Sequence, residues 1–232
     1  MALGLTSLVM AFSDRITIAA YCIIGAAFFD VFDGLAARLL KATSEFGKQL
    51  DSLSDLVSFG VAPSMILYQL LIMTFVNNSE GGTFLVENAT LTQSLILYSA
   101  YTPALFGAIR LARFNITDKK KGVFYGLPIP AAALFIVAIW LVLANTHSDA
   151  IRNLIINFKF LFVFNGLLAF LMVSNIQLLA LQFDGLSLRK NFPRYLVIAS
   201  GIVLITLFKE MGIIHTMGLY LVISLIFVSF RA

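Results

Sequence analysis

Charged residues are scarce in this chain: they make up 12% of its 232 residues, whereas hydrophobic residues make up 60%. An ordinary soluble domain carries roughly 25% charged residues. Apolar runs of about 20 residues, the length that crosses the hydrocarbon core of a bilayer as a helix, recur along the whole sequence. The composition therefore excludes a soluble protein and predicts an all-α, polytopic bundle of transmembrane helices.

Cysteine and long polar segments are scarce as well. The single Cys22 lies in an apolar stretch and cannot form an internal disulfide, so we interpret it as a small buried hydrophobic residue. Residues 1–12 lack a basic leader region and a cleavage site, which argues against a signal peptide and favours a short or trimmed first span. No polar stretch is long enough for a second domain, so residues 1–232 are expected to form one membrane-embedded domain.

The apolar runs predict eight spans. Their approximate ranges are 1–13, 16–40, 49–76, 92–114, 126–146, 154–180, 194–209 and 212–230. The last two lie so close together that they must form a tight hairpin around residues 209–212.

The basic residues indicate which side of the membrane each connection faces, because short cytoplasmic loops are enriched in Lys and Arg. Twelve of the 16 basic residues fall on one side of the eight-span layout, and the other four are Arg15, Arg152, Lys159 and Lys209. The bias predicts that both termini and the 38–50 connection are cytoplasmic. We expect the protein in the cytoplasmic (inner) membrane, with any site near residues 38–50 facing the cytoplasm.

Four aspartates stand at two helical spacings around this connection. Asp30 and Asp33 are three residues apart, and Asp51 and Asp55 are four apart. Both spacings put side chains on the same side of an α-helix, one turn apart. Because the two helices are consecutive and antiparallel, we expect all four carboxylates to meet near the cytoplasmic end.

Such a group of carboxylates needs a counter-charge. An ionised carboxylate near hydrocarbon costs at least a few kcal/mol, and like charges close together add repulsion. Two divalent cations would neutralise four carboxylates, and Mg2+, Mn2+ and Ca2+ are the ions that prefer such oxygens. No His or Cys lies nearby in the sequence, which argues against zinc or copper. A paired-metal site of this kind is suited to phosphoryl transfer.

Small residues and one arginine accompany the aspartates. Gly34, Ala37 and Gly47 would let a bulky ligand approach the helix backbones, and Arg38 could bind a phosphate through its planar fork. Each has a simpler reading, since small residues pack membrane helices together and Arg38 alone could anchor a cytoplasmic helix end. In combination with four spaced aspartates, they favour a ligand site.

The full string D-V-F-D-G-L-A-A-R, followed after eight residues by G-x3-D-x3-D, resembles the signature of the CDP-alcohol phosphatidyltransferases, and every signature position is filled. The resemblance implies a membrane-embedded, metal-dependent enzyme that transfers a phosphatidyl group from a CDP-lipid to an alcohol and releases CMP. It also implies roles for named residues. The implied metal ligands are Asp30, Asp33, Asp51 and Asp55, with Asp55 also the general base, and the implied CDP contacts are Asp30, Gly34, Ala37, Arg38 and Gly47.

Flanking segments resemble the phosphatidylserine synthase branch of that family. They are LDSLSDLVSFGVAPS, IRLARFN, FYGLPIPAA and LMVSNIQ. Leu56 stands where the glycerol-phosphate and cardiolipin branches usually carry Lys. The expected acceptor is thus L-serine, whose carboxylate calls for an Arg or polar donors. Our candidates for acceptor binding are Arg110, Arg113, Asn115 and Ser58.

Other functions stay open from sequence alone. The acceptor could be glycerol 3-phosphate or inositol phosphate, or the intramembrane carboxylates could belong to a cation transporter. A transporter would not need the glycines, Ala37 and Arg38 at these spacings. The expected partners are CDP-diacylglycerol, L-serine, CMP, membrane lipids and a second copy of the chain in a homodimer, with no nucleic acid.

Overall fold

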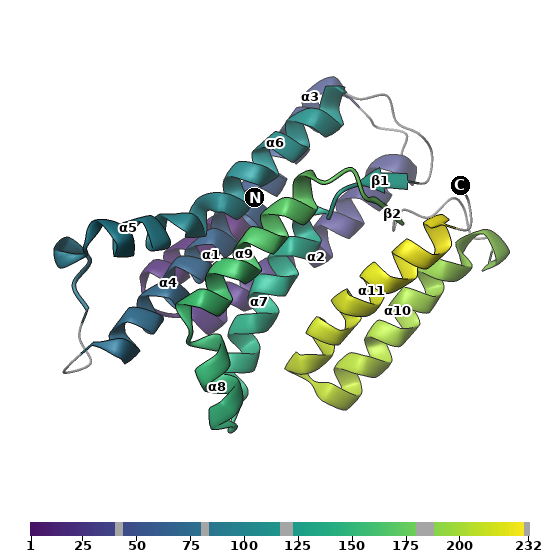
Figure 1. Cartoon of the computed structure of the whole chain (residues 1–232). Helices are drawn as coiled ribbons and strands as arrows, with labels where there is room; N and C mark the ends of the chain where they lie inside the picture. Colours follow the sequence, from purple (N-terminus) through teal and green to yellow (C-terminus); the bar gives the residue numbers. More distant parts are fainter. Residues whose placement is uncertain (40–43, 80–83, 117–122, 180–187, 230–232) are drawn as a thin grey trace.

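The structure is a computed structural model that describes residues 1–39, 44–79, 84–116, 123–179 and 188–229. It is that of a helical membrane protein, with a single two-stranded antiparallel sheet in this part of the chain (Figure 1). The helices are α1 (Ala2–Phe12), α2 (Ile16–Leu39), α3 (Glu45–Asp55), α4 (Ala62–Asn78), α5 (Leu91–Tyr98), α6 (Thr102–Ile116), α7 (Ile129–Asn145), α8 (Asp149–Ile155), α9 (Phe158–Val173), α10 (Leu188–Phe208) and α11 (Glu210–Ser229). The strands are β1 (Val123–Tyr125) and β2 (Gln177–Leu179).

Each of the eight predicted spans corresponds to a helical stretch. Three stretches of the described chain are long and apolar enough to cross a membrane unaided, namely Ile16–Gly34, Glu45–Asn78 and Leu91–Asn115. The pair α8 and α9, bent by 61°, would make a fourth. The other four predicted spans coincide with shorter apolar helices, Ala2–Phe12, Ile129–Asn145, Phe192–Phe208 and Met211–Ile226. Only 28% of the Ile16–Gly34 window is buried, as expected of a helix that meets lipid.

Two of the predicted ranges need correction. The predicted span 154–180 is two helices, because the chain breaks between Ile155 and Phe158, and residues 177–179 form β2 rather than helix. The predicted span 49–76 begins earlier, at Glu45, where the Ser44 hydroxyl caps α3 by accepting from the Gly47 amide at 3.0 Å. Within that run, residues Leu56–Val61 form a π-helix, η1, that joins α3 to α4.

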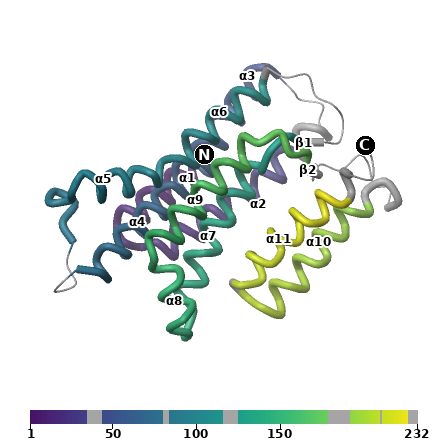
Figure 2. The backbone as a smooth tube through the Cα atoms, viewed as in Figure 1, coloured from purple at the N-terminus to yellow at the C-terminus, as the bar shows by residue number. Residues whose placement is uncertain are grey.

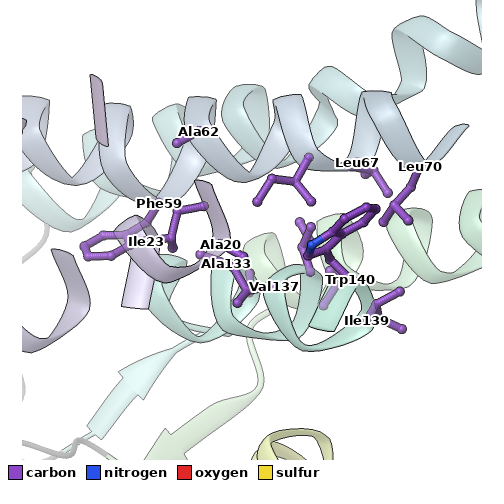
Figure 3. Packing of buried hydrophobic residues seen from close by; sticks show 14 of the residues in the cluster. Ala20, Ile23, Phe59, Ala62, Leu67, Leu70, Ala133, Val137, Ile139 and Trp140 are labelled. Atoms are coloured by element: carbon purple, nitrogen blue, oxygen red, sulfur yellow. The ribbon is translucent and has the colours of Figure 1, made fainter. Parts of the chain in front are cut away.

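The core lies where α2, α4 and α7 pack together. Figure 3 shows Trp140 of α7 beside Leu67 and Leu70 of α4, with Ile23 of α2 in the same cluster. All four are buried. The Trp140 indole N–H also donates to the Thr17 hydroxyl at 3.2 Å, which satisfies its polar atom and ties α7 to α2.

A tight turn links β1 to α7. Gly126 adopts φ +73°, and a Cβ there would lie 2.4 Å from the Met172 carbonyl oxygen, so only glycine fits. Its amide donates to the Ile176 carbonyl at 2.8 Å, and the next amide, of Leu127, donates to Leu171 at 2.8 Å. These two hydrogen bonds therefore hold the turn against the end of α9 and against Ile176, the residue before β2.

The last two helices form a hairpin, as the sequence predicted. Its turn is at Lys209, whose φ is +50°, and α10 and α11 run side by side from there (Figures 1 and 2). Gly212 lies so close to the Leu204 carbonyl that a Cβ would clash with it, and Gly201 lies against Thr216. The hairpin packs through α11 against α7 and β2.

Candidate functional site

Three of the four predicted carboxylates meet where the C-terminal halves of α2 and α3 come together. Oxygens of Asp30, Asp51 and Asp55 all lie within 4.8 Å of one another, and we call these residues the carboxylate cluster. The carboxyl groups of Asp30 and Asp55 are within hydrogen-bonding reach. Asp30 and Asp55 are half-buried, whereas Asp51 is exposed.

This geometry fits a hard divalent cation. Carboxylate oxygens at this separation can share one ion, and they would otherwise repel one another. The grouping contains only aspartates, so nitrogen and sulfur donors of the kind zinc and copper prefer are missing from it within the described chain. The carboxylate cluster can therefore hold a metal.

The π-helix η1 begins directly after Asp55 and fixes the position of this end of α3. Its residues Ser58, Phe59 and Gly60 are buried. On one side Gly4 of α1 lies against Ser58, where a Cβ would be 2.7 Å from the Ser58 Cα atom. On the other side a Cβ on Gly60 would lie 3.3 Å from the Ala104 Cα atom of α6. Single π-turns of this kind recur at functional sites in helices.

Asp33 does not join the carboxylate cluster. It is exposed on α2 and interacts electrostatically with Asp30. Three residues of an α-helix turn through about 300°, so the Asp33 side chain points about 60° around the helix from Asp30. The spacing placed the two on neighbouring sides of α2 but not in one ligand group.

The residues predicted to contact CDP lie on the same two helices as the carboxylate cluster. Gly34 is exposed and follows Asp33 on α2, and Gly47 is exposed in the first turn of α3. Ala37 and Arg38 lie within α2, but their side chains fall outside the described part of the structure. Their roles stay predictions.

Arg110 of α6 lies near the carboxylate cluster. Its guanidinium interacts electrostatically with Asp55, and its Nη2 donates weakly to the Gly126 carbonyl oxygen at 3.5 Å. Its Nε is buried and, among the described residues, has no hydrogen-bond partner. The guanidinium thus has donor capacity left beside Asp55.

The other predicted acceptor contacts have varied surroundings. The Asn115 amide donates to the Ser52 hydroxyl at 3.0 Å, and the Lys48 ammonium donates to the Asn115 backbone carbonyl at 3.3 Å, so Asn115 joins α6 to α3. Arg113 is exposed on α6. Ser58 is buried against Gly4 of α1 rather than turned into the carboxylate cluster.

Sequence reasoning missed two residues near the site. Lys48 was counted only as a cytoplasmic charge, yet it binds the end of α6. Tyr220 of α11 interacts electrostatically with Arg110, although the two are more than 100 residues apart. Spacing carries no signal for contacts between elements so distant in the sequence.

Comparison with known proteins gives a consistent result. The sequence model of the CDP-alcohol phosphatidyltransferase family matches residues 1–165, more than half of the chain. A protein of Helicobacter pylori named CDP-diacylglycerol–serine O-phosphatidyltransferase is 36% identical over 177 residues, which cover 75% of this chain. Proteins of the same name are 39% identical over 110 residues in Bacillus subtilis and 46% identical over 109 residues in Methanocaldococcus jannaschii, each match covering 47% of this chain.

These matches do not extend over the whole of the relatives. They cover 66% of the Helicobacter, 52% of the Bacillus and 43% of the Methanocaldococcus protein. The matched family region, 1–165, contains the whole carboxylate cluster and Arg110. Tyr220 lies beyond it.

Proposed function

Because the chain belongs to the CDP-alcohol phosphatidyltransferase family, we propose that it transfers the phosphatidyl group of CDP-diacylglycerol to L-serine, giving phosphatidylserine and CMP. The names of the relatives from three organisms support serine as the acceptor. The observation that carries the proposal is the carboxylate cluster, three aspartate oxygens within 4.8 Å on α2 and α3.

The cluster and its neighbour Asp33 are proposed to hold two divalent cations. Bound Mg2+ or Mn2+ would supply positive charge beside the substrate pyrophosphate and the leaving CMP, and Ca2+ is a possible occupant of the same oxygens. The exposure of Asp51 and Asp33 leaves this side of the site open to a nucleotide.

Asp55 is the proposed general base. It takes the proton from the serine hydroxyl as that oxygen attacks the phosphorus that carries the diacylglycerol. The bond from this phosphorus to the bridging pyrophosphate oxygen breaks, and CMP leaves with that oxygen. The π-helix that follows Asp55 is packed on both sides, which holds the carboxylate in place for this role.

Substrate binding is divided between the two sides of the carboxylate cluster. On the α2 and α3 side, Gly34, Ala37, Arg38 and Gly47 are proposed to line the CDP site, together with Asp30. On the α6 side, the spare donors of Arg110 are proposed to bind the serine carboxylate, since a guanidinium binds a carboxylate through paired hydrogen bonds.

The membrane surroundings suit a lipid substrate. On α3, Phe46 is 77% exposed and Leu50 is 48% exposed, adjacent in sequence to Asp51. Acyl chains can lie along such apolar side chains while the pyrophosphate reaches the carboxylates.

The arrangement in the cell is proposed from the sequence. The distribution of basic residues supports eight spans, two cytoplasmic termini and a site that faces the cytoplasm from the inner membrane. Residues 1–232 then form one membrane-embedded domain, which we propose to work as a homodimer.

The test is CMP release from CDP-diacylglycerol by purified protein in detergent. It is run with L-serine or glycerol 3-phosphate, with Mg2+, Mn2+ or a chelator, on the natural protein and on Asp55→Asn. Asp14→Asn is the matched control, because Asp14 lies in the turn before α2 with φ +59°, a conformation that Asn accepts readily.

We expect release that needs serine and a divalent cation, is at least 100-fold slower in Asp55→Asn and is unchanged in Asp14→Asn. Release with glycerol 3-phosphate but not serine would overturn the acceptor and keep the reaction type. Failure with both acceptors, in protein that shows a cooperative unfolding transition, would contradict the proposed function.

A further inference from the structure

The surroundings of Arg110 extend beyond the region shared by the family. Its guanidinium lies between the carboxylate cluster and the turn that begins α7, where Nη2 reaches the Gly126 carbonyl oxygen at 3.5 Å. A hydrogen bond of that length is weak and does not by itself fix the orientation of the guanidinium. A second group is needed to hold it in one orientation.

Tyr220 is placed to be that group. Its side chain is 2% exposed on α11; its hydroxyl lies within hydrogen-bonding reach of the Ser224 side chain one turn further on and interacts electrostatically with Arg110. Helix α11 packs against α7, which follows Gly126, and against β2, whose partner strand β1 precedes Gly126. Three independent contacts therefore bring the C-terminal hairpin, the Gly126 turn and Arg110 to one place.

The hairpin is closely packed near its turn. Gly212 meets the Leu204 backbone, and a Cβ on Gly201 would lie 2.8 Å from the Thr216 methyl carbon, so α10 and α11 are in close contact over the turns next to Lys209. Such close-packed helices hold a side chain in one rotamer. Figure 1 shows the hairpin beside the two strands, in agreement with the contacts of α11 with β2.

We propose that Tyr220 is a positioning residue for acceptor selection: it orients the Arg110 guanidinium so that the remaining donors face the carboxylate of an amino-acid acceptor. A phenol oxygen can accept a hydrogen bond from a guanidinium, and the arginine keeps donors for the substrate. This inference rests on the proposed function. It assigns part of the choice of acceptor to α11, which lies outside the matched family region 1–165.

The test is steady-state kinetics of Tyr220→Phe, which removes only the hydroxyl. We expect the KM for serine to rise roughly tenfold, the usual range for loss of one hydrogen bond to a charged group. The KM for CDP-diacylglycerol should stay unchanged, and the unfolding temperature should fall by no more than a few degrees, through loss of the hydroxyl's interaction with Ser224. Tyr98→Phe is the control, because Tyr98 is a half-exposed tyrosine on α5 that stacks on Tyr101.

A double-mutant cycle with Arg110→Lys separates positioning from packing. If Tyr220 acts through the guanidinium, Tyr220→Phe should change the serine KM by less than twofold once Arg110 is Lys. An unchanged serine KM in the single variant, or a rise in both KM values with a lower unfolding temperature, would overturn the inference and leave the proposed function intact. If the natural protein itself shows no serine-dependent release, the proposed function fails first and this inference with it.

Discussion

Helices α3 and α4 belong to one continuous helical run, yet they differ in almost every physical respect. No residue of α3 is buried, and it carries Asp51 and Asp55. In α4, Leu67 and Leu70 are buried against α2 and α7 (Figure 3). The π-helix η1 stands between the two halves and is itself buried.

The difference shows how stability and chemistry are divided. The tightly packed half supplies packing energy, and the open half presents charged groups to substrates. Since α3 has few buried contacts of its own, its position depends on η1 and on the Lys48 and Asn115 hydrogen bonds to α6. Substitutions in α4 should therefore lower the free energy of unfolding, whereas substitutions in α3 should mainly affect activity.

The largest stability effect is expected from Leu67→Ala in α4. Leu67 is fully buried, so the change leaves a cavity and should lower the free energy of unfolding by about 2–5 kcal/mol. The emission of Trp140, the only tryptophan and a neighbour in the same core, reports unfolding directly.

Leu53→Ala in α3 is the matched control, because Leu53 is 57% exposed. It should change the free energy of unfolding by no more than about 0.5 kcal/mol. Equal destabilisation by the two substitutions would contradict the contrast between α3 and α4.

A smaller effect is expected from Gly4→Ala, which tests the packing of α1 on the π-helix. The added Cβ would lie 2.6 Å from the Ser58 hydroxyl oxygen, so the helices must separate. Overpacking of this kind costs about 1–3 kcal/mol. Because η1 follows Asp55 directly, CMP release should fall as well.

Gly166→Ala on α9 is the matched control for that change. A Cβ at Gly166 meets no atom within 4 Å in the described structure, so this substitution should leave stability equal or raise it by about 0.5–1 kcal/mol. The same loss from both changes would show that the Gly4 contact has no special role.

The smallest effect is expected from Thr17→Val, which keeps the shape of the side chain and removes the hydroxyl that accepts from Trp140. The free energy of unfolding should fall by about 1 kcal/mol, and the Trp140 emission of the folded protein should change. Thr6→Val, at an exposed threonine of α1, should change neither the free energy of unfolding nor the Trp140 emission. Unaltered emission in Thr17→Val would argue against the link between α2 and α7.

The sequence allowed much of the carboxylate cluster to be predicted, because helical spacing is local information. The four-residue spacing put Asp51 and Asp55 on one side of α3, and the short connection between α2 and α3 put Asp30 opposite them. The structure brings these three together. Asp33 lies near Asp30 on α2 but outside the group within 4.8 Å, so its role as a ligand stays a prediction.

Features that depend on tertiary contacts could not be predicted in this way. The π-helix after Asp55 has no pattern of its own in the sequence LVSFGV, and it is packed between Gly4 and Ala104, which come from distant helices. The pairing of β1 with β2 also joins segments more than 50 residues apart. The break between α8 and α9 does have a local signal, because the Asn157 side chain caps α9 by accepting from the Lys159 amide at 2.9 Å. Tyr220 looked like one more aromatic residue in an apolar span.

The most direct test of the carboxylate cluster is Mn2+ binding, measured by electron paramagnetic resonance on the purified protein in detergent. It requires neither substrate nor turnover. We predict that the natural protein and Asp14→Asn bind Mn2+ with the same affinity, and that Asp51→Asn binds it at least tenfold more weakly, because one of three converging carboxylates is lost. Equal Mn2+ affinity in Asp51→Asn and the natural protein would contradict the assignment of the carboxylate cluster as the metal site.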